Sequence, residues 1–503
     1  MQTPERFKQI GFLCLALFLI PLIGWLTGHY VETRYEAQFR NLVINTEKLI
    51  TAQEYETRGL SYISVCRNLT KDDGNEAKKI CSFADEVHYA KDSSLLTAAI
   101  GVFLFALIVG GRIIAGTNRR RMSLVFGPLV RVVMLLLAIS VLAQGALFVY
   151  SVYTLEAAAI QRVHGGLLAA VGIGALVACW VLLRYSIGLL KSEPMVLRGV
   201  LLDKSKQRGI YDLTNKIAAK LKAEPPDFII VGLEPNFFVT ASKINLIGHE
   251  GLIQGRTLFI SLSLLRVFGE DELASVIGHE LGHFRGEDVA YSMKFAPTYA
   301  RLGKALGNLG SDSGSAADIA KLPAIVALGM CFMEFAAAER TIGRERELLA
   351  DRAGAEAADG FALARALVKV SFFAPHWARL SRANVDALAE GRMFTNLSQT
   401  YAQVCHELTE NLDWAAAQQE LGKYVQPHPI DTHPPLQQRL ENLGVTLTDI
   451  SPQQLVAPER AAITLIEDAQ TIEESLSNLE AQWLIAIGAV VTPKTESPEA
   501  PGS

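Results

Sequence analysis

The sequence has 503 residues, of which half are hydrophobic, and a formal net charge of −5. Together with a positive mean hydropathy, this composition is unusual for a purely soluble protein, so we expect a membrane-embedded part. No region is strongly basic, which excludes a nucleic-acid-binding protein.

Apolar stretches dominate the first 191 residues. A helix needs about 20 apolar residues to cross a bilayer. Four stretches approach or exceed this length, at about 10–28, 93–111, 125–155 and 165–190. We therefore expect residues 1–191 to form an α-helical membrane domain in contact with lipid. The first stretch is too long for the apolar core of a signal peptide and is interpreted as an anchor.

Basic residues indicate how this domain is oriented. They concentrate at Arg112 and Arg119–Arg121, and again between Lys191 and Arg208. By the positive-inside rule both regions face the cytoplasm, which places the N-terminus inside and the loop 29–92 outside. Cys66 and Cys81 lie in this loop, where the outer side would permit a disulfide. Two unpaired thiols remain the alternative.

The composition becomes that of a soluble domain from residue 192, and we expect a catalytic domain at 192–447. Its pattern predicts a helix over Tyr211–Lys222 and a small sheet. The expected strands of that sheet are 227–231, 236–241 and 256–261.

Two further helices are expected in this part of the chain. One begins at the acidic segment Gly269-Glu270-Asp271-Glu272 and runs past His283. The other covers about 323–358, and its apolar front part, 323–338, is interpreted as a buried or interfacial helix, although a fifth span stays open. Residues 448–503 are expected to form a C-terminal extension with a helix near 458–487 and a disordered tail at 493–503.

The chemistry is indicated by His279-Glu280-Leu281-Gly282-His283. Residues four apart share one face of a helix, so both imidazoles can bind one zinc ion while Glu280 lies beside it as general base. Bound zinc would lower the pKa of a water molecule and polarise a scissile carbonyl. The alternative is an amphipathic helix that contains these residues by chance.

A second sequence motif supports a zinc site. In Glu347-Leu348-Leu349-Ala350-Asp351 the two acids also share a helix face. Glu347 is predicted to be the third metal ligand, and Asp351 to accept the outer N–H of a ligand histidine. Without the first motif, a solvated charged face would be the better interpretation.

Together the two elements resemble the integral-membrane gluzincins of the HtpX and CAAX-prenyl-protease family. Two further segments are similar to that family: Pro235-Asn236-Phe237-Phe238, with Phe237 in place of a small residue, and Asp431-Thr432-His433-Pro434-Pro435 followed by Arg439. The resemblance covers about 194–444. It implies an α+β, mainly helical, zincin-like domain holding one Zn²⁺ per chain in a bacterial inner membrane.

The resemblance also implies roles for three residues outside the metal motifs. His433 and Arg439 would face the oxyanion that forms on the attacked carbonyl, and Asn236 would hold substrate. A turn histidine, a surface charge and a turn former are the respective alternatives.

The expected function is a membrane-bound zinc endopeptidase of protein quality control, acting on protein or peptide substrates near the bilayer. A protease that processes one prenylated or peptide substrate is the narrower alternative. A catalytically silent membrane scaffold with structural zinc is the alternative from another class, although structural sites usually supply four protein ligands.

Overall fold

A computed structural model of the chain describes residues 3–67, 75–160, 162–190, 194–284, 295, 298–303, 306, 316–410, 412–423 and 434–490. The chain divides into two compact units. Unit 1 comprises Met1–Lys191 and Thr298–Ala337, and unit 2 comprises Ser192–Pro297 and Ala338–Ser503. The sequence-based domains 1–191, 192–447 and 448–503 remain predictions.

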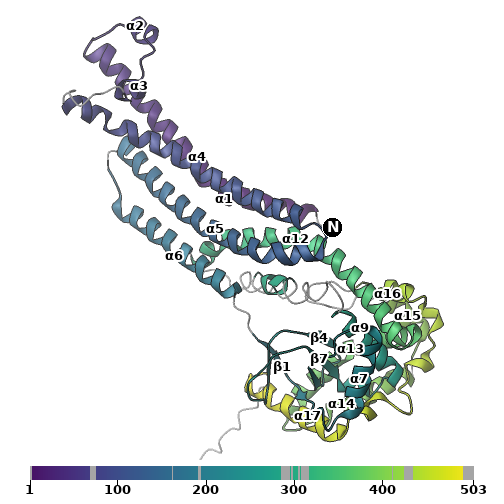
Figure 1. Cartoon of the computed structure of the whole chain (residues 1–503). Helices are drawn as coiled ribbons and strands as arrows, with labels where there is room; N and C mark the ends of the chain where they lie inside the picture. The colour runs from purple at the N-terminus through teal and green to yellow at the C-terminus, as the bar shows by residue number, and fades with distance from the viewer. Residues whose placement is uncertain are drawn as a thin grey trace, which may run out of the picture. The chain divides into compact units, whose positions relative to one another are not determined.

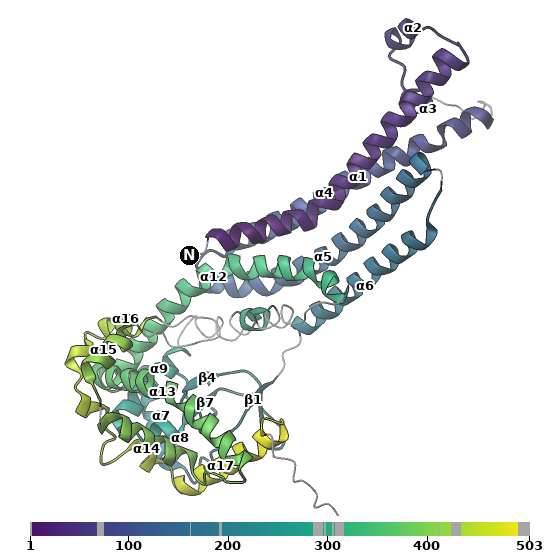
Figure 2. The same ribbon diagram turned by 180° about the vertical axis from the view of Figure 1, so that it is seen from behind.

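Four long helices make up most of unit 1. They are α1 (Thr3–Asn41), α4 (Asn75–Ala115), α5 (Arg119–Leu155) and α6 (Gly165–Leu190). Each contains a stretch apolar enough to cross a membrane, with mean hydropathies from 2.3 to 2.5. Helix α5 contacts α1, α4 and α6, and α1 also contacts α4 (Figures 1 and 2). The predicted helical membrane part is confirmed.

A small cap lies at the end of α1 that is remote from the N-terminus (Figure 1). It contains η1 (Leu42–Thr46), α2 (Ala52–Thr57) and α3 (Tyr62–Arg67). The carboxylate of Glu36 accepts hydrogen bonds from the Tyr55 hydroxyl and from the Tyr62 backbone N–H, at 2.5 and 2.6 Å. These bonds fasten the cap to α1.

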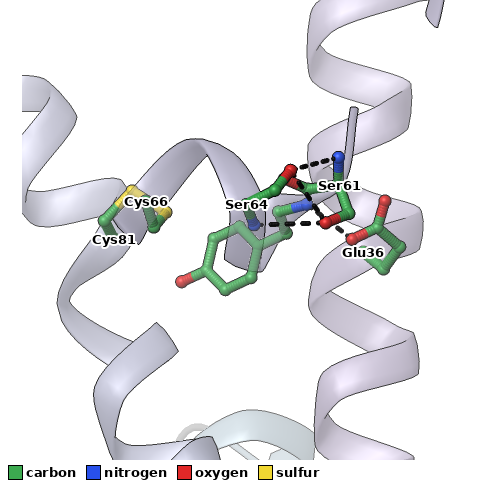
Figure 3. The surroundings of a disulfide bond; sticks show 6 residues. Glu36, Ser61, Ser64, Cys66 and Cys81 are labelled. Atoms are coloured by element: carbon green, nitrogen blue, oxygen red, sulfur yellow. Dashed lines mark hydrogen bonds between the residues drawn. A yellow bond between two sulfur atoms is a disulfide. The ribbon is translucent and has the colours of Figure 1, made fainter. Parts of the chain in front are cut away.

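The cap is also joined covalently to the next helix. Figure 3 shows the Cys66–Cys81 disulfide, which links α3 to α4, beside the Ser61 and Ser64 hydrogen bonds. The structure therefore has the disulfide for which the sequence left two alternatives. The connection between α5 and α6 through η2 (Glu156–Ile160) lies at the same end of the bundle as the cap (Figure 1).

Helix α12 (Ala316–Ala357) contains the apolar segment that the sequence left between a buried helix and a fifth span. Its apolar stretch is Ile325–Ala336, which is shorter than the four spans. The ring of Phe335 is buried and lies 4.9 Å from that of Phe126 in α5. Within unit 1 this part of α12 therefore packs against α5.

Unit 2 contains two small sheets where the sequence predicted one. The first has the strand order β2-β3-β7-β4 and the second the order β1-β5-β6. The predicted strands correspond to β3, β4 and β7. The strands are β1 (Met195–Leu197), β2 (Val200–Leu201), β3 (Phe228–Gly232), β4 (Phe238–Thr240), β5 (Ile244–Leu246), β6 (Leu252–Ile253) and β7 (Thr257–Ser261).

Strand register brings β4 to an edge of its sheet. Strands β3 and β7 are parallel, and β4 runs antiparallel to β7 with Val239 opposite Leu258. In β7 all five residues are buried, as expected for a central strand, whereas those of β4 are half-buried.

Helices cover one face of the first sheet and bury the main hydrophobic core of unit 2, and the other face packs against the second sheet. Helix α9 contacts α7, α13 and β4. The helices of this unit are α7 (Arg208–Leu221), α8 (Leu262–Leu265), α9 (Glu270–Gly282), α13 (Gly360–Ala389), α14 (Leu397–Glu410), α15 (Trp414–Lys423) and α16 (Leu436–Asn442). Together with the sheets they confirm the predicted mainly helical α+β domain.

The C-terminal extension is part of this core. It contains η4 (Leu447–Asp449), η5 (Pro452–Leu455), η6 (Ala462–Leu465) and α17 (Ala469–Ala486). The predicted helix over 458–487 is therefore too long at its start, and the predicted tail at 493–503 lies outside the described residues.

A buried carboxylate holds α17 in place. Glu473 is fully buried and accepts hydrogen bonds from Arg266, Asn396 and Ser398 at 2.5 to 2.8 Å. Because a buried charge is stable only when it is paired and hydrogen-bonded, this network fixes α17 against α8 and α14.

Candidate metal centre and active site

Helix α9 carries the first motif and is anchored at its start. The Glu272 carboxylate accepts the backbone N–H of Gly269 at 2.7 Å and the ammonium of Lys369 in α13 at 2.9 Å. Lys369 also donates to the Val267 carbonyl at 2.8 Å. Burial lowers the pKa of Lys369, although the charge of Glu272 opposes this effect. This ion pair was not predicted from the sequence. The lysine within the apolar run of residues 366–370 indicates a buried, paired charge.

The helix ends slightly earlier than predicted. Its last residue is Gly282, and His283 is the C-cap, still in right-handed helical geometry with φ −68° and ψ −15°. The prediction that α9 continues past His283 is wrong, but the cap geometry keeps the spacing of a helix. His279 and His283 therefore still share one face, with ring centroids 5.0 Å apart.

Glycines allow α9 to approach the C-terminal half of α12 closely. A Cβ at Gly278 would overlap the Cβ of Ala357, and one at Gly282 would lie 2.9 Å from the Cβ of Ala353. From α12, a Cβ at Gly354 would lie 2.7 Å from the carbonyl oxygen of Ser275. The small residues thus set the distance between the two helices that carry the predicted metal ligands.

This approach brings the three predicted ligands together. The Glu347 carboxylate lies 3.6 Å from Nε2 of His279 and 3.5 Å from Nε2 of His283. One donor atom from each residue lies within 4.8 Å of the other two, a spacing compatible with a shared metal ion. Two imidazoles and one carboxylate are donors that suit zinc.

Glu280 follows the first ligand and is buried beside the cluster. Burial raises the pKa of its carboxyl group to about 7, with the charge of Glu347 adding to the rise. The charges of His279 and Arg439 and the nearby backbone of Val239 in β4 oppose this rise by favouring the ionised form. A carboxyl group in this state can accept and return a proton near neutral pH.

Asp351 and Arg439 lie next to Nδ1 of His279, a predicted metal ligand. The Asp351 carboxylate is 2.9 Å from Nδ1 of His279 and accepts two hydrogen bonds from the guanidinium of Arg439, at 2.6 and 3.0 Å. Burial alone would lower the pKa of His279, but the hydrogen bond and charge of Asp351 outweigh it and raise that pKa. The arrangement orients Nε2 of His279 toward Glu347.

The charges of the site fit a divalent cation. Glu280, Glu347 and Asp351 are buried carboxylates, and Arg439 is a buried cation that contacts Asp351 and Glu347. Fully ionised, three carboxylates against one guanidinium leave two negative charges in excess. Because buried charges need compensation, a Zn²⁺ ion at the His279-His283-Glu347 cluster would balance this excess.

Substitution of Gly278 tests the helix approach. Gly278→Ala should push α9 from α12, destabilise the protein by about 1–3 kcal/mol and weaken zinc binding, because overpacking outweighs the gain in helix propensity. The matched control is Gly422→Ala in α15, where nothing lies within 4 Å of the added Cβ. Thermal unfolding and zinc titration would measure both effects, and equal behaviour of the two variants would contradict this role of Gly278.

Asn236 and His433 are the remaining predicted site residues. Asn236 lies two residues before β4 with an exposed side chain, and its backbone N–H bonds to the Glu234 carbonyl at 2.8 Å. The ring of Phe237 is buried and stacks on Phe268 with centroids 5.8 Å apart, so it points into the core. His433 lies outside the described residues.

Comparison with protein families places this site in a known group. Residues 206–446 match the model of peptidase family M48. This range includes both predicted metal motifs, which confirms the resemblance that the sequence indicated.

Curated relatives give the same grouping. The chain is 26% identical over 235 residues to a protein named Protease HtpX homolog from Archaeoglobus fulgidus, covering 45% of this chain and 64% of that relative. A protein of the same name from Methylibium petroleiphilum is 31% identical over 182 residues, covering 34% and 59%. The chain thus spans about three fifths of these two relatives. No solved structure matches it significantly.

Proposed function

Because residues 206–446 match the model of peptidase family M48 and the chain is similar to HtpX proteases, we propose that the protein is a membrane-anchored zinc endopeptidase. The observation that carries the proposal is the cluster of buried His279, partly buried His283 and buried Glu347, with Glu280 beside it. Zinc bound there would supply a Lewis acid and an acidified water.

Each residue of the site would have a separate role in peptide hydrolysis. His279, His283 and Glu347 would hold the metal. Glu280 would take the proton of the attacking water and return it to the leaving amine, for which a pKa near neutrality is suited. Asp351 would keep His279 in the tautomer that presents Nε2 to the metal.

Strand β4 supports a class of substrate. It is the last strand of its sheet, and it contacts α9, the helix that carries Glu280. An extended peptide could add to this edge through main-chain hydrogen bonds, which would place a peptide bond near the base and tolerate many side chains. This favours unfolded or membrane protein segments as substrates, as in quality control. Asn236 and His433 would then contact substrate and oxyanion.

We propose an orientation with unit 2 in the cytoplasm and the loop 29–92 on the outer side of a bacterial inner membrane. Arg119–Arg121 at the start of α5 support it through the positive-inside rule, and the Cys66–Cys81 disulfide suits an oxidising compartment. A reporter fused after Leu447 should be active only inside the cell. Outer activity would reverse the orientation without touching the chemistry.

Metal removal tests the proposed activity. The full chain purified in detergent should contain one zinc ion and cleave unfolded casein. A chelator should abolish cleavage, and one equivalent of zinc per chain should restore it, because the cluster offers a single set of three ligands.

Two outcomes would contradict the proposal. Cleavage that persists in protein shown to be free of metal would exclude a metallopeptidase. Stoichiometric zinc without cleavage of casein or of a panel of membrane proteins would favour the silent scaffold, the alternative in which the zinc is structural.

A further inference from the structure

The last turn of α17 is apolar and uncovered. The side chains of Ile485 and Ile487 are 57% and 54% exposed. Earlier in the same helix, Leu476 and Leu484 are buried against unit 2. The apolar character therefore continues beyond the part of the helix that the core of unit 2 covers.

Arg198 ties this helix end to the start of unit 2. Its Nε lies 2.5 Å from the Glu480 carboxylate, and its guanidinium stacks on the Trp483 ring at 4.0 Å from the centroid. Figures 1 and 2 both show the C-terminal end of α17, in yellow, beside β1. The last turn of α17 and β1 thus form one surface region.

Strand β1 adds an exposed apolar side chain to this region. Val196 is 62% exposed. The strand register pairs Val196 with Asn245 of β5, and Asn245 with Leu252 of β6. Since paired residues lie on the same side of a sheet, Val196 and the exposed Leu252 belong to its outward face.

The connection to the membrane part limits where this surface can be. Met195 follows Leu190, the last residue of the apolar helix α6, by five positions. An extended chain spans at most about 3.6 Å per residue, so roughly 18 Å separate Met195 from the end of α6 at most. The bilayer around α6 is therefore the nearest apolar environment for an exposed apolar surface at β1.

We propose that the last turn of α17 and β1 form a lipid-contacting surface of unit 2 that inserts into the bilayer interface. Ile485, Ile487 and Val196 supply aliphatic surface that gains free energy on leaving water. Trp483 and Arg198 are of the residue types that occupy the boundary between acyl chains and headgroups. The surface would fix unit 2 against the membrane independently of any catalytic activity.

Lipid quenching of single-site probes tests this proposal in the full chain. A Cys14→Ser background removes the exposed thiol and keeps the Cys66–Cys81 disulfide. Ile487→Cys and Val196→Cys would each be labelled with a small fluorophore and reconstituted in nanodiscs with or without brominated phospholipids. We expect brominated acyl chains to cause a loss of emission at both positions.

Two control sites make the result decisive. Ile173→Cys, exposed on α6, should be quenched as a lipid-facing position. Gln470→Cys, exposed near the start of α17, lies about 25 Å from residue 487 along the helix and should keep its emission. Emission that persists at 487 and 196 while 173 is quenched would overturn the proposal. Disulfide cross-linking of Ile487→Cys between two copies without quenching would replace it by an interface between chains.

Discussion

Glu280→Gln should lower the rate of peptide cleavage by about 10²- to 10⁴-fold while the protein keeps one zinc ion per chain. The amide has nearly the shape of the carboxylate but cannot accept the proton of a water molecule. The three proposed ligands, His279, His283 and Glu347, are unchanged, so zinc content should stay that of the wild type. Casein cleavage and metal analysis on the same sample would measure both.

A second glutamate on α9 provides the control. Glu270→Gln removes an exposed carboxylate from the first turn of the same helix and should leave both cleavage and zinc content unchanged. Near-wild-type cleavage by zinc-loaded Glu280→Gln would show that another group is the base. Loss of zinc together with activity would instead assign Glu280 to holding the metal site together.

Arg439→Met should be the most destabilising single substitution at the site, costing about 3–5 kcal/mol. It removes the partner of the fully buried Asp351 and leaves the carboxylates of Glu280 and Glu347 without their nearby cation. Zinc affinity should also fall, by about 10- to 100-fold, because Asp351 would no longer be held against His279. Thermal unfolding and zinc titration would measure the two effects.

Further variants separate pairing from packing. Asp351→Asn combined with Arg439→Met should recover part of the stability, since no unpaired charge remains at this pair. Arg439→Lys should not recover it, because one ammonium cannot form the two-armed contact. Arg392→Met, at an exposed arginine paired with Glu390, is the control and should change stability by no more than about 0.5 kcal/mol. An Arg439→Met variant as stable as this control would contradict the role of the pair.

The position of Arg439 bears on its expected role. Two of its nitrogens bond to Asp351, and Nη2 lies 3.4 Å from Nδ1 of His279. These contacts place Arg439 beside Nδ1 of His279, away from Nε2, the nitrogen that faces Glu347. They are those of a residue that positions His279. The oxyanion role that the resemblance implied for Arg439 and His433 stays a prediction.

Local patterns determined much of this protein. Span length and hydropathy predicted four long apolar helices, and short apolar runs bounded by turn residues predicted β3, β4 and β7. Four-residue spacing placed His279 and His283 on one face. These features depend on residues close together in the chain, so period and composition are sufficient to predict them.

Only the tertiary structure decided what depends on contacts between distant segments. Strands of two or three residues, such as β2 and β6, have too short a pattern to stand out, and form because a neighbouring strand pairs with them. Glu473 looks like a surface residue of an amphipathic helix, yet it is fully buried by partners more than seventy residues away.

The predicted metal cluster depends both on local sequence and on contacts between distant segments. The sequence identified its residue types, but 64 positions separate His283 from Glu347. Their approach depends on Gly278, Gly282 and the small side chains of α12, which let two helices lie closer than larger side chains would allow. The sequence by itself determined which residues could bind a metal; helix packing decided that they meet, because donor distances are set by the backbones that carry them.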